Sequence, residues 1–173
     1  PSLVGAIACA HQLGVDWEVL VDRARGFGGI SARCSVHQMP GRPIFIDDST
    51  KAPLGTAAMP FALLGDFVAP RKTIVIGQLS DYRGAQNRAY RQVCIEADKY
   101  ADRIIVLSRT AKYLRKGKEL AEDTELCTFE SWRDLANLLE NSMVPDEVIF
   151  LKSANNYHLS RVVLNEVEPV TCN

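Results

Sequence analysis

The most abrupt change of character in the chain lies in residues 43–56, which read Pro43-Ile44-Phe45-Ile46-Asp47-Asp48-Ser49-Thr50-Lys51-Ala52-Pro53-Leu54-Gly55-Thr56. An apolar run stops there in two acids, two hydroxyl side chains and a lysine. In an open α/β sheet, ligands bind just beyond the carboxyl ends of the strands. The stretch therefore predicts a buried strand followed directly by a ligand site.

The residues before this strand predict that it is one half of a β-hairpin. Residues 34–39 and 42–47 flank Pro40-Gly41, a dipeptide that fits the centre of a type II turn. A hairpin centred there pairs Arg33 with Asp48, with their Cβ atoms about 5 Å apart. We therefore expect a cation and an acid at the same end of the hairpin.

Beyond this hairpin, apolar runs alternate with segments of helical composition. The runs predict strands at 73–77, 103–107, 126–129 and 148–152. Helices are expected at 57–67, with Thr56 as N-cap, and at 83–101, 109–121, 131–142 and 155–167. The alternation is typical of crossover helices between parallel strands. We predict the α/β class, with a Rossmann-like, mostly parallel sheet of about six strands, an N-terminal β-hairpin and flanking helices.

The first 30 residues have a different pattern. Apolar side chains recur at helical spacing through residues 2–13, and a second helix is expected from Trp17. The run Gly26-Phe27-Gly28-Gly29 then breaks the helical pattern. No strand precedes these helices, so we interpret residues 1–30 as the helical tail of a preceding domain with a linker, and residues 31–173 as the α/β domain.

Composition excludes several classes of protein. With 173 residues, 47% hydrophobic and 24% charged, the chain is an ordinary globular sequence. A net charge of -1 gives no global reason to expect nucleic acid or a membrane surface as partner. Five widely spaced cysteines are typical of reduced thiols in the cytoplasm, and no apolar run approaches the length of a membrane span.

Several catalytic motifs are absent from the sequence. There is no G-x-x-x-x-G-K-[ST] loop, so the chain alone cannot cradle a triphosphate in the P-loop manner. A G-x-S-x-G elbow is also missing, and no histidine and cysteine have zinc-ligand spacing. We therefore predict no catalytic residue and no metal site within these residues.

The polar residues at the predicted strand ends leave alternatives open. Asp47 and Asp48 could hold Mg²⁺, accept ribose hydroxyls or be solvated. Lys51 is a compact cation suited to phosphate or carboxylate, although most loop lysines are simply solvated. Lys152 ends the last predicted strand at the same edge of the sheet, where its ammonium group points either into the site or out to solvent.

Taken in order, these motifs resemble the C-terminal domain of the Mur ligases of peptidoglycan synthesis. Residues 47–56 resemble the D-D-S-Y-N-A-N-x-G-S element of the member that adds D-alanyl-D-alanine, the closest match. Residues 75–84 resemble the V-L-G-D-M-x-E-L-G element, and residues 150–153 resemble V-K-G-S. Residues 2–15 resemble the helix that closes the central ATPase domain. The chain departs from the pattern at Pro53, at Gln78 and in lacking a glycine between Lys152 and Ser153.

The resemblance implies an ATP-dependent ligase that forms an amide bond through an acyl phosphate. By this resemblance, Arg33 would meet the ATP phosphates and Asp48 the ribose. The residues that would orient the incoming amino acid or dipeptide are Ser49, Lys51, Lys152 and Ser153. ATP and Mg²⁺ would be held mainly by a central domain upstream, which with an N-terminal domain would be the partner of this one. Residues 1–173 alone are therefore predicted to be inactive.

Two other functions remain open at this point. A receiver-type signalling domain also has an acid pair after its first strand and a lysine after its last strand, but Gly77 and Ser108 occupy the candidate strand ends where its phosphoacceptor Asp would be. A non-catalytic, regulatory nucleotide-binding domain is the other alternative, because of the departures at Gln78 and Pro53.

Overall fold

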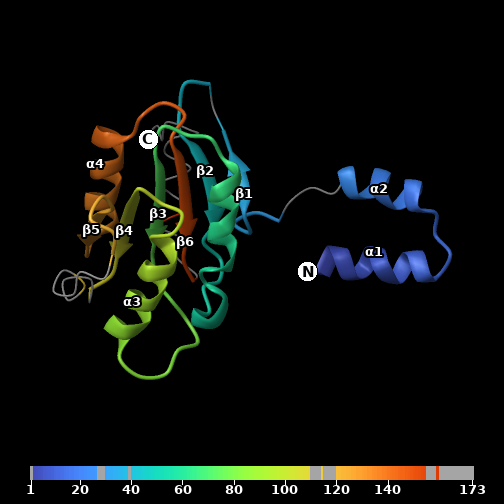
Figure 1. Ribbon diagram of the computed structural model, residues 1–173, viewed down its shortest axis with the longest axis horizontal. Coiled ribbons are helices and arrows are strands. Elements are labelled where there is room, and N and C mark those ends of the chain that lie inside the picture. Colours follow the sequence, from blue (N-terminus) through green and yellow to red (C-terminus); the bar gives the residue numbers. More distant parts are fainter. Residues whose placement is uncertain are drawn as a thin grey trace, which may run out of the picture.

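The computed structural model describes residues 2–26, 30–38, 40–109, 114, 120–154 and 159. Figure 1 shows a pair of helices, α1 (Ser2–Gln12) and α2 (Trp17–Arg25), and an α/β domain. The two helices contact each other, and Asp16 caps α2 by accepting a hydrogen bond from the Glu18 N–H at 3.1 Å. Both predicted helices of the first 30 residues are thus present. Within the described residues, no helix has the length and apolar character that a membrane crossing requires.

The α/β domain is built on one sheet of six strands in the order β1-β2-β6-β3-β4-β5. The first two strands form the antiparallel hairpin, and all other neighbours are parallel. The strands are β1 (Ser35–His37), β2 (Ile44–Asp48), β3 (Lys72–Ile76), β4 (Arg103–Leu107), β5 (Glu125–Phe129) and β6 (Val148–Lys152). The predicted fold class is confirmed.

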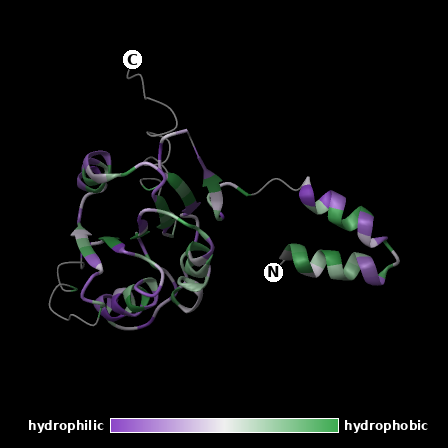
Figure 2. Cartoon of the chain, turned by 45° about the horizontal axis from the view of Figure 1, so that its top comes forward, coloured by the Kyte–Doolittle hydropathy of each residue, from purple (hydrophilic) through white to green (hydrophobic). Residues whose placement is uncertain are grey.

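Helices cover both faces of the sheet, because its central strands are apolar on both sides. On one face, Ile74 and Phe150 pack with residues of η2 (Met59–Asp66) and α3 (Gln86–Ala97). On the other, Val75 and Ile149 pack with Leu135 and Leu139 of α4 (Trp132–Ser142). Figure 2 shows the green, hydrophobic strands between helices that carry purple, hydrophilic residues.

The segment after β2 differs from the helix predicted at 57–67. It forms two 3₁₀-helices, η1 (Leu54–Thr56) and η2, so Thr56 ends the first helix and does not cap the second. Proline disfavours the α conformation in the residue before it, which prevents a continuous α-helix through Pro60. The proline is tolerated near the start of η2, where its missing N–H has no intrahelical acceptor. The helices predicted at 109–121 and 155–167 lie largely outside the described residues.

The hairpin is also shifted by one residue from the predicted pairing. Gly41 has the left-handed φ of 71° that a type II turn needs at its third position, as predicted. However, Ser35 pairs with Asp47 and His37 with Phe45, so the hairpin is centred on Gly41 and not between Pro40 and Gly41. Continued by one residue, this register places Cys34, not Arg33, opposite Asp48. The predicted pairing of Arg33 with Asp48 was therefore wrong.

The strand order argues against a receiver-type domain. Receivers have the flavodoxin-like order 2-1-3-4-5, in which the last strand lies at an edge of the sheet. Here the last strand, β6, is inserted between β2 and β3. The acid pair and the lysine at the strand ends therefore belong to a different topology.

A buried ionic network joins the strands at the edge where they begin, which we call the amino edge. The carboxylate of Glu147 accepts hydrogen bonds from Arg103 at 2.9 Å and from Arg71 at 2.9 and 2.7 Å. Thr73 also donates to this carboxylate, and Arg103 donates to the Ser142 hydroxyl at 2.8 Å. Because Glu147 and Arg103 are 0% and 1% exposed, the network is part of the core.

Candidate functional site

The loops that follow β2, β3 and β6 are hydrogen-bonded to one another at the opposite end of the sheet, which we call the carboxyl edge. The Leu54 N–H donates to the Ser80 carbonyl at 3.0 Å, and the Ser80 N–H donates to the Ala52 carbonyl at 2.8 Å. The Ala154 N–H donates to the Gln78 carbonyl at 2.7 Å. These bonds join segments far apart in the sequence, so the carboxyl edge has a defined backbone.

Asp48 and Lys152 meet at this edge and form a buried ion pair. They are direct neighbours in the register of the parallel strands β2 and β6, and the Lys152 ammonium group donates to Asp48 Oδ2. Only 6% of Asp48 and 5% of Lys152 is exposed. The Lys152 ammonium group therefore does not point out to solvent. It points inward to Asp48, where it compensates the charge of a buried carboxylate.

The other polar residues of the same strand ends support the local backbone. Asp47 Oδ1 accepts a hydrogen bond from the Ser49 N–H at 3.1 Å, which fixes the turn after β2. Ser153 Oγ accepts one from the Gln78 N–H at 2.9 Å and so joins the loops after β3 and β6. Ser49 and Ser153 are 2% and 0% exposed, so neither presents its hydroxyl group at the surface.

Gly77 is a residue of this site that sequence reasoning missed. A Cβ atom at position 77 would lie 2.6 Å from Ser153 Oγ and 2.8 Å from Leu159 Cδ1. The carbonyl of Gly77 also accepts a hydrogen bond from the Tyr90 hydroxyl at 3.0 Å. Gly77 therefore allows β3 and the end of β6 to approach closely.

We expect Gly77→Ala to lower the free energy of unfolding by about 1–3 kcal/mol, because the methyl group overpacks the contact with Ser153. Urea denaturation measures the change. Gly65→Ala is the matched control, because a Cβ at that position meets nothing within 4 Å. Equal stabilities of the two variants would show that the contact at Gly77 is not tight.

Cys34 lies beside the ion pair. Burial raises the pKa of its thiol, the Asp48 carboxylate raises it further, and the Lys152 ammonium group lowers it. The half-buried Cys34 thiol is therefore close enough to both charged groups of the pair for each to affect its pKa. The sequence contained a signal for this contact, since the correct hairpin register places Cys34 opposite Asp48.

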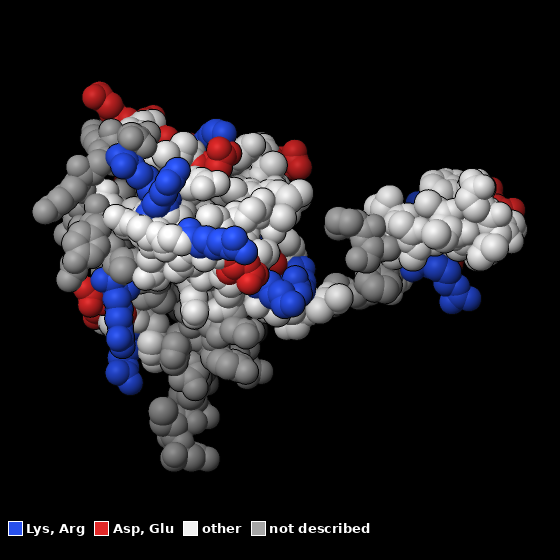
Figure 3. All heavy atoms as spheres, turned by 90° about the horizontal axis from the view of Figure 1, so that it is seen from below, with Lys and Arg blue, Asp and Glu red and all other residues white. Residues whose placement is uncertain are grey.

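Exposed cations lie on the loops of the carboxyl edge, the same edge at which the buried pair is found. Each comes from a different loop: before β1, after β2, after β3, after β4 and at the start of α4. These residues are Arg33, Lys51, Arg83, Arg109 and Arg133. Figure 3, which views this edge, shows blue side chains spread across it, with red ones among them and at its rim. The exposed acids in these loops and at the start of α4 are Asp81, Glu130 and Asp134, fewer than the five cations. The carboxyl edge is thus basic although the whole chain carries a net charge of -1.

A hollow of about 690 Å³ lies at this basic edge, beyond the ends of β3, β4 and β5. Its lining includes Arg109, Glu130, Tyr82 and Trp132, and the Arg133 guanidinium lies over the Trp132 ring at 5.4 Å from its centre. This hollow was not identified from the sequence. The charged residues Arg109, Glu130 and Arg133 follow β4 and β5, two strands that were predicted from the sequence. Their position just after strand ends was the signal that could have located this hollow.

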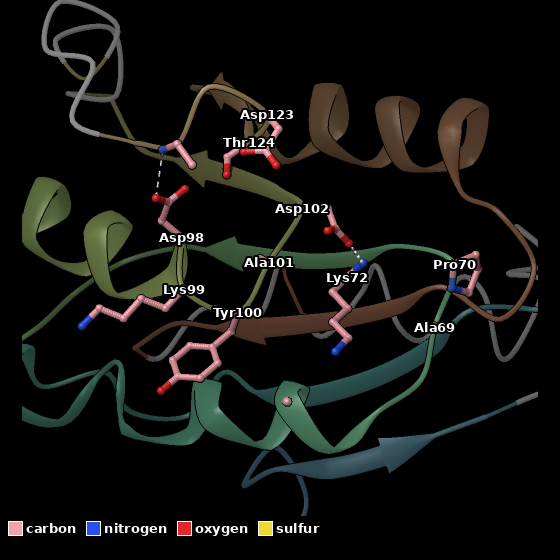
Figure 4. Close-up of a pocket in the computed structure, with 12 residues that line it drawn as sticks. Ala69, Pro70, Lys72, Asp98, Lys99, Tyr100, Ala101, Asp102, Asp123 and Thr124 are labelled. Carbon is pink, nitrogen blue, oxygen red and sulfur yellow. Dashed lines mark hydrogen bonds between the residues drawn. The ribbon is translucent and has the colours of Figure 1, made fainter.

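A second hollow, shown in Figure 4, lies at the amino edge, and its charged lining consists of three aspartates and two lysines. Its acids support the backbone: Asp102 Oδ2 accepts from the Lys72 N–H at 2.7 Å, and Asp98 Oδ2 accepts from the Ala121 N–H at 3.0 Å. Nowhere in the described parts of the chain do three side chains of His, Cys, Asp or Glu gather as a metal site would require. We therefore place the candidate site at the carboxyl edge.

The sequence matches no protein-family profile and no curated protein, whereas solved structures match most of the chain. MurF from Acinetobacter baumannii aligns with a TM-score of 0.77 at 20% identity, over 94% of this chain and 36% of its own. A pseudomurein peptide ligase type C from Methanothermus fervidus aligns with a TM-score of 0.65 at 15% identity, over 96% of this chain and 35% of its own. MurF from Thermotoga maritima, solved in complex with ADP, aligns with a TM-score of 0.63 at 15% identity, over 83% of this chain and 34% of its own.

This chain therefore spans about a third of the length of the ligases that it matches. The strand order, the hairpin and the flanking helices agree with the resemblance drawn from the sequence motifs. The chain has the fold of a Mur ligase C-terminal domain, and MurF enzymes are among its structural neighbours.

Proposed function

We propose that this chain is the C-terminal domain of an ATP-dependent Mur-type ligase, which closes over ATP and binds the incoming amino acid or dipeptide. The observation that carries the proposal is the set of exposed cations on the loops of the carboxyl edge. On this fold, the carboxyl edge is where ligands bind, and both the phosphates of ATP and the carboxylate of an amino acid are anions. The ADP in the Thermotoga maritima MurF structure supports the choice of nucleotide.

Arg33 and Lys51 fit the phosphates of ATP best among the residues predicted from the sequence. Both are exposed, and a hydrogen bond joins their loops, from Thr50 Oγ1 to the Ala32 carbonyl at 2.9 Å. When bound, ATP would supply the phosphoryl group that converts a substrate carboxylate into an acyl phosphate. The two cations would offset phosphate charge and orient the transferred phosphoryl group toward that carboxylate.

The buried residues of the site have a different role in this proposal. Asp48, Ser49, Lys152 and Ser153 have too little exposed surface to be the first contacts of a ligand. We propose that they form the frame beneath the cations. A contact of Asp48 with ribose, or of Lys152 with an acceptor carboxylate, would require the ion pair to open when the domain closes.

The hollow beyond β3, β4 and β5 is the proposed place for the acceptor. An amino acid or dipeptide carries a carboxylate and an amine, and Arg109, Arg133 and Glu130 supply charges of the opposite signs. Tyr82 and Trp132 add flat apolar surfaces for its carbon atoms.

The proposal requires further domains of the same protein. In this proposal, Mg²⁺ is held mainly by a central ATPase domain. Residues 2–26 expose Val4, Leu13, Trp17 and Val19, which are 70, 85, 55 and 50% exposed. We propose that the central domain covers these side chains, that closure occurs about the linker, and that the ligase acts in the cytoplasm.

The test is an ATP titration of the ¹⁵N-labelled 173-residue chain, followed by amide chemical shifts. We expect shifts to concentrate at the carboxyl edge. Arg33→Ala should weaken ATP binding by about tenfold or more, as the loss of one charged hydrogen bond of about 1.5–3 kcal/mol predicts. Lys99→Ala, which removes an exposed cation from the amino edge, is the matched control and leaves the affinity unchanged. Shifts confined to the amino edge would contradict the proposal.

Turnover separates the ligase from a non-catalytic nucleotide-binding domain. We expect no phosphate release from ATP by the chain alone, because it has no P-loop. Joined to the domains that precede it, the chain should support phosphate release that depends on an amino acid or dipeptide. ATP binding without such release in the complete protein would favour the regulatory alternative.

A further inference from the structure

The backbone around Arg33 has an unusual conformation. Ala32 and Cys34, the residues on either side, have φ angles of 55° and 54°, in the left-handed region that residues with a Cβ seldom adopt. Such strained residues persist only where the surrounding structure fixes them, and they concentrate at ligand sites. The contacts that fix this segment are therefore of functional interest.

Two hydroxyl side chains hold both polar groups of Ala32. Thr50 Oγ1 donates to the Ala32 carbonyl at 2.9 Å, and the Ala32 N–H donates to Ser35 Oγ at 3.1 Å. The Arg33 N–H donates to the Ile30 carbonyl at 3.1 Å and closes a turn. The chain entering Arg33 is thus tied to the loop after β2, although Arg33 itself is exposed.

The bond from Thr50 also links the positions of two cations. Ala32 directly precedes Arg33, and Thr50 directly precedes Lys51. A single hydrogen bond therefore joins the residue before one exposed cation to the residue before the other. Thr50 is half-buried, so this bond has less competition from water than the cations have.

We propose that Thr50 is a positioning residue that holds Arg33 and Lys51 at a fixed spacing and makes them one site for a phosphate chain. The inference rests on the proposed function, in which both cations meet ATP phosphates. Two cations held in place lose less conformational entropy on binding than two independent loops would. Removal of the Thr50 hydroxyl should therefore weaken the binding of an anion that the hydroxyl itself does not touch.

The test uses tripolyphosphate as probe, titrated into the ¹⁵N-labelled 173-residue chain at fixed ionic strength. We expect Thr50→Val to lower the affinity for tripolyphosphate about fivefold, as the loss of a preorganising contact predicts. Thr50→Ser, which keeps the hydroxyl group, should retain the affinity of wild type. Thr50→Ala removes the same group without a branched side chain and serves if the valine variant does not fold. The amide order parameters of residues 31–34 should fall in Thr50→Val and remain unchanged in Thr50→Ser.

A double-mutant cycle separates positioning from direct contact. If Thr50 acts through Arg33, adding Thr50→Val to Arg33→Ala causes no further loss of tripolyphosphate affinity. If Thr50→Val lowers tripolyphosphate affinity by the same factor with Arg33 present and with Arg33→Ala, the positioning role is overturned. It is also overturned if Thr50→Val binds tripolyphosphate as tightly as wild type while Arg33→Ala binds it weakly. Failure of the wild-type chain to bind tripolyphosphate would instead overturn the proposed function on which the inference rests.

Discussion

Glu147→Ala is expected to lower the free energy of unfolding by about 3–5 kcal/mol, because removal of one partner leaves buried charge uncompensated. The Glu147 carboxylate is fully buried and accepts hydrogen bonds from Arg71, Thr73 and Arg103. Without it, the guanidinium of Arg103, only 1% exposed, has no carboxylate within the described network. Urea denaturation followed by circular dichroism measures the loss.

The matched control is Glu140→Ala, which removes an exposed glutamate from α4. We expect it to change stability by no more than about 0.5 kcal/mol, as for most surface substitutions. Similar losses in the two variants would mean that the buried network does not stabilise the fold. Arg103→Met combined with Glu147→Leu tests the same point, since replacement of a buried pair by apolar residues is often neutral.

The same network gives the sign of a pH effect. Burial raises the pKa of Glu147, but the hydrogen bonds from Arg71 and Thr73 and the charge of Arg103 together outweigh burial and lower it below the usual 4.5. A carboxyl group with a depressed pKa in the folded state stabilises the fold above its unfolded pKa, and this stabilisation is lost as pH falls through the folded pKa. The advantage of wild type over Glu147→Gln should therefore shrink below about pH 4.5.

The fold was predictable because its strands are short apolar runs that end in polar residues. The strands β4 and β6 have the predicted bounds, since Arg103 and Lys152 interrupt the apolar runs there. Local signals were less decisive where two rules compete. Pro40-Gly41 indicated the hairpin but not its register, because one more or one fewer residue in the loop changes the pairing of every side chain.

The site was predictable as a place and less so as a set of roles. Sequence alone placed Asp48 and Lys152 at one edge of the sheet. The structure confirms this, because the two residues are direct neighbours in the pairing of β2 and β6. It could not show that the two side chains satisfy each other, because strand order is set by tertiary packing and not by the local pattern. For the same reason Gly77 was read only as a motif residue, since its close contact with Ser153 joins two distant strands.

Lys152→Ala is expected to lower the free energy of unfolding by about 3–5 kcal/mol, a loss comparable to that of Glu147→Ala. The substitution leaves the Asp48 carboxylate, only 6% exposed, without its ammonium partner. Lys51→Ala is the control, because it removes an exposed lysine from the same edge and should change stability by no more than about 0.5 kcal/mol. Equal stabilities of these two variants would show that the ion pair makes no net contribution.

The double variant Asp48→Asn with Lys152→Met separates the structural role of the pair from a role in binding. Removal of both charges avoids an uncompensated one, so we expect most of the stability lost in Lys152→Ala to return. ATP affinity of this folded variant then reports on ligand contact alone. If Asp48 only supports the site from below, the double variant binds ATP as wild type does. Arg33→Ala then lowers ATP affinity by the same factor in wild type and in the double variant. A loss of ATP affinity in the stable double variant would show instead that the pair opens to meet the nucleotide.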